Sequence, residues 1–470
     1  MHHCLLTLVA LVVGVASSSF ANTWELVLQD RIWFPSVFWE GDTLGGADCW
    51  GWIGPDSTNY AIMGVVEGTA ICRVVEEGEQ ASLDVVQIIP GPKRDDYYFH
   101  RDYKTLGHYL YHVAEMTGEG EGVQIMDLST LPDSVRVVGS YVYADQTTSH
   151  NLSIDLKTGF AYVLRSDAEG LRILDLNDPE SPLELPWHYI GDVHDVYADN
   201  DTVWVAEGWT GNWSIWDFTD KEAPALLARV VPPDLGYLHN VWPTTDHSHV
   251  ISTQETDYRT VKFWDVRDLS DIKLVSEYLA PSKLAHNAHV EGDFAFISHY
   301  HSGVRMVDIR QPSAPVEVAF FDTYPAGEIP RFNGCWGVYP HTARGYVYAS
   351  DIEGYLTLLK VKENETSVAD DTPAPAGQPR ATLEPNFPNP FNPHTTLPFT
   401  TTTAGPVRLE ILDIRGARVR LLLDETRGSG THRVQWDGTD AQGRTVPSGV
   451  YLAVLGAGDV VETRHLALVK

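Results

Sequence analysis

The sequence is poor in positive charge: 33 Lys and Arg residues stand against 64 Asp and Glu, which gives a formal net charge of −31 at pH 7. Nucleic acids and anionic membrane surfaces are bound through basic patches, so this balance argues against both as partners. No apolar run reaches the about 18 residues of a membrane-spanning helix, and we therefore expect no transmembrane span. Hydrophobic residues nevertheless make up 43% of the 470-residue chain, which is enough to build sizeable cores.

Motifs that would point to a reaction are also missing. The sequence contains no G-x-S-x-G nucleophile elbow, no H-E-x-x-H zinc helix and no C-x-x-C pair. The glycine-rich stretch at 118–122 lacks the lysine and the spacing of a phosphate-binding loop. The sequence therefore indicates architecture more clearly than chemistry. Whether the protein is an enzyme stays open, and a non-enzymatic role is favoured.

The first 21 residues have the pattern of a signal peptide. An apolar run from Leu5 to Val15 precedes small residues, and Ser19 and Ala21 occupy the −3 and −1 positions of a cleavage site. The segment lacks the usual basic residue at its start, and a buried core segment is the alternative interpretation. We expect cleavage before Asn22 and an exported protein, secreted or held at the cell surface.

A repeated segment determines the expected fold. Five alternating apolar strands each end in Asp, and these Asp residues are spaced by 48, 42, 48 and 43 residues. The five strands are GVQIMDL (122–128), GLRILDL (170–176), NWSIWDF (212–218), TVKFWDV (260–266) and GVRMVDI (303–309). Weaker copies at 68–74 and 355–361 bring the number of units to seven.

Each unit of about 45 residues also contains further short apolar stretches and, in several cases, a Pro-containing turn, with no amphipathic helical pattern. Four short strands per repeat are typical of a β-propeller blade. We therefore predict an all-β chain with a seven-bladed β-propeller over residues 22–362. The Asp that ends each repeated strand is expected to cap the following turn by accepting a hydrogen bond from the amide two residues further on.

The segments LRILDLNDPESP and VRMVDIRQPSAP resemble LVIVD repeats. The wider run from 48–64 through 320–340 to 348–361 resembles the choice-of-anchor B family, and the resemblance covers about residues 45–362. It implies an extracytoplasmic propeller whose C-terminal attachment signal varies between members. It implies no particular reaction.

A recurrent residue pair opens the first strand of each predicted blade. The pairs are Trp50-Gly51, Arg101-Asp102, His150-Asn151, His194-Asp195, His239-Asn240, His286-Asn287 and Trp336-Gly337. Because the first strand of a blade is the innermost, these positions should surround one mouth of the central channel. The ends of the second strands should return to the same mouth, at Arg165, Glu207, Gln254, His299 and Asp351.

Two interpretations of this mouth remain open. In the first it is a ligand site, whose candidate residues are His150, His194, Glu207, His239, His286 and His299. Imidazoles are ordinary ligands of zinc, iron or copper, so one transition metal could be held there and activate water. Its candidate ligands are His194, His239, His286 and His299. In the second interpretation each pair hydrogen-bonds the strand-opening loop of its own blade, which the repetition of one residue type favours.

Three cysteines remain after the expected cleavage, an odd number for an oxidising compartment. Cys49 and Cys335 each precede Trp-Gly, at equivalent positions in the first and seventh blades, which become neighbours when the ring closes. We predict a Cys49–Cys335 disulfide that locks this closure, with Cys72 as a buried thiol. The alternative is that all three thiols are reduced and buried.

The C-terminal part of the chain differs from the repeats. Residues 363–382 are rich in Pro, Ala, Thr and Asp and are expected to form an extended linker. Residues 383–470 alternate short apolar strands with turns, which predicts a small β-sandwich. The segments that carry a further resemblance are NFPNPFNP (386–393), WDG (436–438), PSGVY (447–451) and HLALVK (465–470).

These segments resemble the type IX secretion, type A sorting domain, whose fold is similar to the immunoglobulin-like domain of flagellar hook-capping proteins. The resemblance implies that an outer-membrane export machinery recognises this domain. We therefore expect an exported, cell-surface-attached propeller that acts as a binding module for a surface or polymer ligand. The alternative is a metal-dependent hydrolase or lyase with its site at the histidine-lined mouth.

Overall fold

The computed structural model describes residues 24–468, apart from 40–41, 94–99, 145–147, 166–169, 326–328, 330, 364–380, 384–385, 387–390, 392, 402–403, 414–417 and 458–459. The predicted signal peptide and most of the predicted linker lie outside the described residues. The chain divides into two compact units, Met1–Glu365 and Thr366–Lys470. Among the described residues, no helix has the length and apolar character that crossing a membrane requires.

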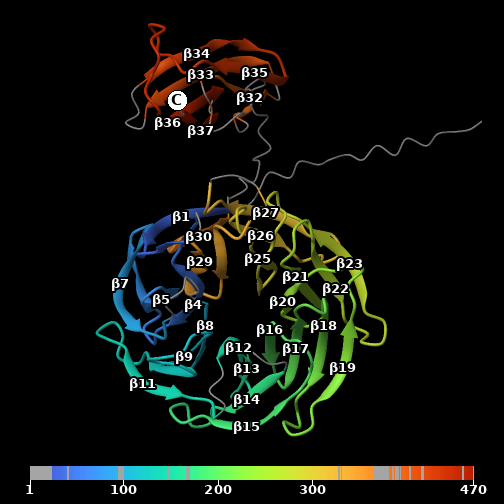
Figure 1. The fold of residues 1–470 in the computed structure, drawn as a ribbon. Coiled ribbons are helices and arrows are strands. Elements are labelled where there is room, and N and C mark those ends of the chain that lie inside the picture. The colour runs from blue at the N-terminus through green and yellow to red at the C-terminus, as the bar shows by residue number, and fades with distance from the viewer. Residues whose placement is uncertain are drawn as a thin grey trace, which may run out of the picture. The chain divides into compact units, whose positions relative to one another are not determined.

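The first unit is an all-β ring, as the repeats predict. Its four-stranded antiparallel sheets stand around a central axis (Figure 1). In chain order, the first three sheets are β4 (Gly46–Ile53), β5 (Asn59–Val65), β6 (Gly68–Glu77) and β7 (Gln80–Pro90); β8 (Arg101–Leu106), β9 (Tyr109–Ala114), β10 (Val123–Asp127) and β11 (Arg136–Tyr141); and β12 (Ser149–Asp155), β13 (Phe160–Arg165), β14 (Leu171–Asp175) and β15 (Leu183–His188).

Four further sheets complete the ring among the described residues. They are β16 (Asp195–Asp199), β17 (Thr202–Glu207), β18 (Asn212–Asp217) and β19 (Ala225–Val230); β20 (Leu238–Pro243), β21 (His249–Gln254), β22 (Val261–Asp265) and β23 (Lys273–Tyr278); β24 (Ala288–Glu291), β25 (Phe294–Ser298), β26 (Val304–Asp308) and β27 (Val316–Phe321); and β28 (Cys335–Tyr339), β29 (Tyr346–Asp351), β30 (Tyr355–Glu363) and β1 (Trp24–Trp33). The hairpin β2 (Val37–Trp39) and β3 (Asp42–Leu44) and the 3-10 turn η1 (Ala343–Gly345) lie between strands.

The start of the chain supplies the outermost strand of the last sheet. β1 pairs antiparallel with β30, from Trp24 opposite Glu363 to Trp33 opposite Tyr355. This pairing closes the ring without a covalent bond, and it gives the edge of β30 a partner. The repeat pattern does not reveal β1, because its sequence WELVLQDRIW lacks the terminal Asp of the repeated strands.

Neighbouring sheets pack through apolar side chains, and the repeated Asp ends each third strand as expected. The carboxylates accept hydrogen bonds from the amide two residues further on, in the pairs Asp127–Ser129, Asp175–Asn177, Asp217–Thr219, Asp265–Arg267 and Asp308–Arg310. The predicted turn-capping role is therefore confirmed.

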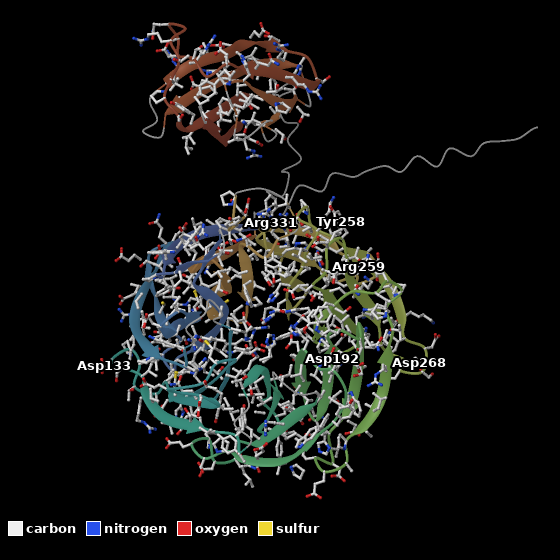
Figure 2. All side chains as sticks on the ribbon, viewed as in Figure 1. Asp133, Asp192, Tyr258, Arg259, Asp268 and Arg331 are labelled. Carbon is white, nitrogen blue, oxygen red and sulfur yellow. The ribbon has the colours of Figure 1, made fainter. Side chains whose placement is uncertain are left out.

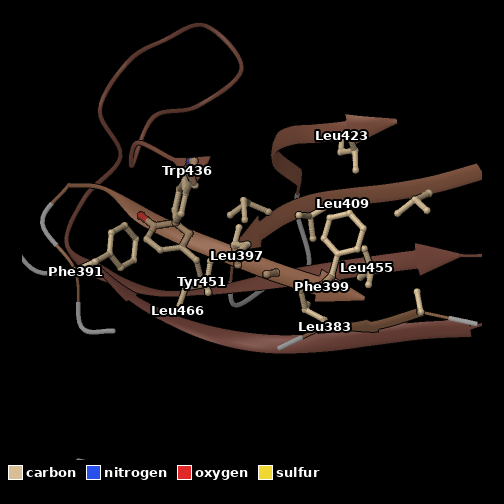
Figure 3. Close-up of a cluster of buried hydrophobic side chains, with 14 of the residues drawn as sticks. Leu383, Phe391, Leu397, Phe399, Leu409, Leu423, Trp436, Tyr451, Leu455 and Leu466 are labelled. Atoms are coloured by element: carbon tan, nitrogen blue, oxygen red, sulfur yellow. The ribbon is translucent and has the colours of Figure 1, made fainter. Parts of the chain in front are cut away.

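The second unit packs two antiparallel sheets around one core (Figure 3). Its strands are β31 (Ala381–Leu383), β32 (Thr395–Thr401), β33 (Gly405–Asp413), β34 (Arg418–Arg427), β35 (Gly430–Trp436), β36 (Gly449–Ala457) and β37 (Val460–Leu468). Trp436 is completely buried, and its ring contacts Phe391 and Tyr451 at centroid distances of 5.4 and 5.2 Å. Phe391 and Trp436 belong to two of the segments that carry the sorting-domain resemblance, so their packing shows that these segments build the core.

The predicted Cys49–Cys335 disulfide is not formed, because Cys49, Cys72 and Cys335 are all free and buried. Cys335 packs in the apolar layer between the sixth and seventh sheets, whereas Cys49 packs in the layer between the seventh and the first. Cys335 precedes the register shift of β28, as Gly46 precedes that of β4, whereas Cys49 follows the shift. The two cysteines are therefore not at equivalent positions, and they line different layers. The alternative, three buried thiols, describes the structure.

We expect alkylation and peptide mapping to find all three thiols free. Without a reductant, Cys49, Cys72 and Cys335 should resist iodoacetamide in the folded protein, because burial raises the pKa of each thiol and shields it from the reagent. All three should be alkylated once guanidinium unfolds the chain. A peptide that links Cys49 to Cys335 would contradict this result.

Candidate functional site

Five imidazoles and one indole form a continuous ring around the axis at one end of the first unit. Adjacent ring centroids lie 3.8 to 5.8 Å apart, in the order His100, His150, His194, His239, His286, Trp336 and back to His100. Side chains project toward this axis from the innermost strands (Figure 2). We call this end of the first unit the histidine face. The structure thus brings four of the six predicted ligand residues together: His150, His194, His239 and His286.

Irregularities at the start of the innermost strands place these side chains. In β12 the pairing register shifts between Ser149 and Leu152, around His150, and in β20 it shifts between Leu238 and Asn240, around His239. The same shift surrounds Trp336 in β28. An extra residue in one strand re-aims its side chain, which turns these rings toward the axis.

The polar residue after each of these rings joins neighbouring sheets. Asn151 Nδ2 and Asn240 Nδ2 donate hydrogen bonds to the two carboxylate oxygens of Asp195, at 3.0 and 2.7 Å. Asn240 Oδ1 accepts a hydrogen bond from the Ala288 amide at 3.1 Å. The side chains of Asn151, Asp195 and Asn240 thus join adjacent sheets.

The first two sheets depart from the predicted pairs. Asp48 accepts a hydrogen bond from the next amide, as Asp102 and Asp195 do, so the equivalent position in the first sheet is Asp48 and not Gly51. In the second sheet the ring member is His100, because the buried Arg101 side chain donates to the Val65 and Pro92 carbonyls.

A compact set of charges lies next to this ring. Lys104 Nζ donates to both oxygens of Asp102, at 2.7 and 2.9 Å. Burial raises the pKa of Asp48 to about 7, with a further contribution from Asp102, and burial raises the pKa of Asp195 to about 6. The Lys104 ammonium group also attracts the other two carboxyl groups, and it lowers their pKa values against the effect of burial.

Four of these imidazoles, those of His100, His194, His239 and His286, are neutral at pH 7. Burial lowers the pKa of His100, His194 and His239 well below the ordinary value, and neighbouring imidazoles lower it further. Burial lowers the pKa of His286 to about 3. A neutral imidazole keeps one nitrogen lone pair, which accepts a proton or binds a metal.

Glu255 lies between two of these imidazoles and was missed by the sequence-based prediction. Its Oε2 is 4.0 Å from His239 Nε2, and its Oε1 is 3.7 Å from His286 Nε2. The Tyr300 hydroxyl donates a hydrogen bond to Oε1. Burial raises the pKa of Glu255 to about 7. Glu255 immediately follows Gln254, the residue selected as the end of the second strand.

The other two predicted ligand residues, Glu207 and His299, have structural partners elsewhere. Glu207 Oε1 accepts a hydrogen bond from Arg229 Nε at 2.8 Å. His299 is fully buried, its Nδ1 lies 2.9 Å from the Ser282 hydroxyl, and its Nε2 accepts a hydrogen bond from the Ala280 amide at 3.4 Å. With both ring nitrogens bonded, His299 is not placed to bind a ligand at the ring.

Exposed aromatic side chains gather on the loops of the histidine face. These loops connect one sheet to the next or join the second and third strands within a sheet. The exposed aromatic residues on them are Phe38, Tyr189, Trp209, Tyr258 and Phe332. On the loops of the opposite face, the large apolar residues exposed within the described ranges are Leu156 and Leu269, neither of them aromatic.

Trp209 is 84% exposed and Tyr258 is 58% exposed. The loop of Trp209 is held by its own amide, which donates to Asp192 at 2.5 Å, and the indole contacts Tyr237 at a centroid distance of 4.7 Å. Figure 2 labels Asp192 and Tyr258. Of the three tryptophans in this region, Trp209 is the exposed one, since Trp213 is fully buried and Trp216 is partly buried.

Two family models match segments of the chain. Residues 284–323 match the LVIVD repeat model, and this segment contains the whole sixth sheet, β24 to β27. Residues 394–459 match the FlgD Ig-like domain model. No curated protein matches the chain. Among solved structures, the WD40 β-propeller domain of Doa1 is similar at 10% identity, with a TM-score of 0.49, over 71% of this chain and 97% of that one.

We predict that His299→Gln reduces the loss of stability on acidification. The pKa of His299 is lowered to about 3, so below its unfolded value of about 6.5 the unfolded chain takes up a proton that the folded state excludes. His299 therefore makes folding less favourable as the pH falls. Between pH 7 and pH 5, the wild type should lose about 2 kcal/mol more unfolding free energy than the variant.

Urea unfolding at the two pH values measures this difference. Gln retains a polar group for Ser282, so the variant should fold at pH 7. Equal pH dependence of the two proteins would show that His299 is protonated in the folded state.

Proposed function

We propose that the protein is an exported binding module, a seven-bladed propeller that holds its ligand on the histidine face. The observation that carries this proposal is the uneven distribution of exposed aromatic residues. Five of them surround one end of the axis, and the exposed large apolar residues described on the other end are all aliphatic. Large exposed apolar groups concentrated on one face typically mark a binding surface. Seven four-stranded sheets among the residues described in the first unit support the blade number.

The ligand that this face fits best is a polysaccharide. Exposed rings such as Trp209 and Tyr258 offer flat apolar surfaces together with a polar edge, which suits the alternating C–H and hydroxyl faces of sugar rings. The separation of the aromatic residues over several loops favours an extended polymer, since each loop contributes one contact. The net charge of −31 disfavours strongly anionic polymers.

We also propose that the protein reaches the cell surface. The signal-peptide pattern of residues 1–21 and the resemblance to the choice-of-anchor B family support export. The Ig-like match of residues 394–459 is compatible with the resemblance of this region to type IX sorting domains. In this proposal, an outer-membrane export machinery recognises the C-terminal domain, residues 383–470, and the linker 363–382 separates it from the propeller.

A second candidate function is a metal-dependent hydrolase or lyase that acts on the same ligand. The observation that favours it is the group formed by His239, Glu255 and His286, whose ligand atoms lie within 4.8 Å of one another. Two imidazoles and one carboxylate are a known ligand set of catalytic zinc. Release of soluble sugars from a bound polysaccharide would distinguish this enzyme from a simple binding module.

Sedimentation with insoluble chitin, cellulose, xylan and peptidoglycan tests the binding function. We expect at least one of these polymers to retain the protein, and the double variant Trp209→Ala, Tyr258→Ala to bind about tenfold more weakly, because two stacking contacts are lost. Both residues are mostly exposed, so the variant should fold normally.

Trp187→Ala is the matched control, since Trp187 is 45% exposed on β15 at the outer edge of the third sheet. It should bind as the wild type does. Failure of all four polymers to retain the wild type, or an equal loss in the control, would refute polysaccharide binding by this face.

A further inference from the structure

We propose that His239, Glu255 and His286 bind one Zn²⁺ ion on the histidine face. This inference goes beyond polysaccharide binding, because it concerns a different ligand and different residues from the exposed aromatic rim. It also revises the predicted set of metal ligands. His299 is excluded because both of its ring nitrogens are hydrogen-bonded elsewhere, and the carboxylate of Glu255 is added as a ligand. The site joins two neighbouring sheets, since His239 and Glu255 belong to the fifth and His286 precedes β24 of the sixth.

The spacing of the ligand atoms is close to what zinc requires. The carboxylate oxygens of Glu255 lie 4.0 Å from His239 Nε2 and 3.7 Å from His286 Nε2. Tetrahedral zinc with bonds of about 2.0 to 2.1 Å holds its ligand atoms about 3.3 Å apart. Side-chain shifts of less than about 1 Å therefore close the site around an ion. The imidazole rings of His239 and His286 already lie side by side, with centroids 4.0 Å apart.

The groups behind the ligands orient them toward this position. His286 Nδ1 lies 2.7 Å from the Trp336 carbonyl, which accepts a hydrogen bond and so fixes the proton on Nδ1. The lone pair of His286 is then on Nε2, the atom that faces Glu255. A backbone carbonyl behind a metal-binding imidazole is the arrangement that raises its basicity and sets its tautomer.

Tyr300 performs the corresponding role for the carboxylate. Its hydroxyl donates to Glu255 Oε1, and its backbone has a φ of 43°, which is unusual for a bulky residue. Two backbone hydrogen bonds with Cys335, both of 3.1 Å, hold Tyr300 in this conformation. Strained residues of this kind cluster at ligand sites, where the surrounding structure stabilises them.

The Glu255 carboxylate favours a bound cation at this site. Within the part of the chain that the structure describes, the ion-pair contacts of Glu255 are to His239 and His286, and no Lys or Arg side chain pairs with it. A divalent ion between the three groups would supply the missing positive charge and allow Glu255 to stay ionised.

Three protein ligands leave one coordination position open, as in catalytic zinc sites. His194 lies beside this position: its ring is 4.2 Å from that of His239, and its buried Nε2 has no hydrogen-bond partner among the described residues. Its Nδ1 is 2.6 Å from the Tyr237 hydroxyl. A water or a sugar hydroxyl bound to the metal would give His194 Nε2 a partner.

Calorimetric titration of the chelator-treated full chain with Zn²⁺ alone tests the proposal. The protein carries no polyhistidine tag, and metal content after gel filtration is measured by plasma mass spectrometry. We expect one Zn²⁺ per chain, a rise in melting temperature on binding, and a tetrahedral visible spectrum when Co²⁺ replaces Zn²⁺. Absence of stoichiometric zinc in the wild type would overturn the proposal.

Two variants test the assignment of Glu255 as a ligand. Glu255→Gln keeps a polar group for the Tyr300 hydroxyl but removes the charge, and we expect a more than 100-fold loss of affinity together with loss of the melting shift. Tyr300→Phe removes only the hydrogen bond to the carboxylate and should weaken binding by about 10- to 100-fold. Comparison of melting temperatures without metal shows whether each variant is folded.

Glu115→Gln is the matched control. Glu115 follows β9 as Glu255 follows β21, and its Oε1 lies 2.9 Å from His150 Nδ1 on the same face. It lies outside the His239–Glu255–His286 group, so its variant should bind zinc as the wild type does. Equal losses in Glu115→Gln and Glu255→Gln would overturn the assignment. Zinc binding without polysaccharide retention would refute only the proposed binding function, and the reverse result would refute only the metal site.

Discussion

The pairing of β1 with β30 is the interaction on which the first unit depends. Each sheet buries its faces against two neighbours, so every apolar layer between sheets requires a closed ring. The last sheet acquires its outer strand from the start of the chain, and closure therefore couples residues 24–33 to residues 355–363 through backbone hydrogen bonds. Because closure is achieved in this way, a covalent link between the first and last sheets is not needed, and the thiols near that boundary stay free.

Because the sheets of the first unit form a closed ring, equivalent residues of their innermost strands come together around the central axis. One residue position of the innermost strands supplies the aromatic ring, and the next supplies Asn and Asp side chains that bond adjacent sheets, as Asn151 and Asn240 do on Asp195. Gly337 shows how tightly this polar layer is filled, because a Cβ there would lie 2.1 Å from Asp48 Oδ1. The same offset explains why Cys49 and Cys335 do not pair, since the counterpart of Cys335 in the first sheet is Gly46 and not Cys49.

The repeat period was sufficient to predict the all-β ring, the turn-capping Asp residues and the convergence of four histidines. The sequence-based prediction erred where a shift of one residue reverses a side chain. It selected Gln254 and His299, which make structural contacts away from the axis, whereas the next residues, Glu255 and Tyr300, meet at the ring. Bulges at the start of the innermost strands are invisible in a periodic pattern, and they determine this offset. β1 could not be recognised, because it lies at the other end of the propeller sequence from its partner β30.

The repetition of histidine from sheet to sheet indicates a structural role for these residues. It does not explain the distinct group of side chains between His239 and His286. The imidazoles recur, whereas the residue after the predicted end of the second strand does not: it is Gly208 in the fourth sheet, Glu255 in the fifth and Tyr300 in the sixth. Glu255 of the fifth sheet has Tyr300 at the same position of the sixth sheet. The Tyr300 hydroxyl can therefore hold the Glu255 carboxylate between two neutral imidazoles. A repeated scaffold thus gains a distinct site through substitutions at one variable position, while the bonds between sheets stay the same.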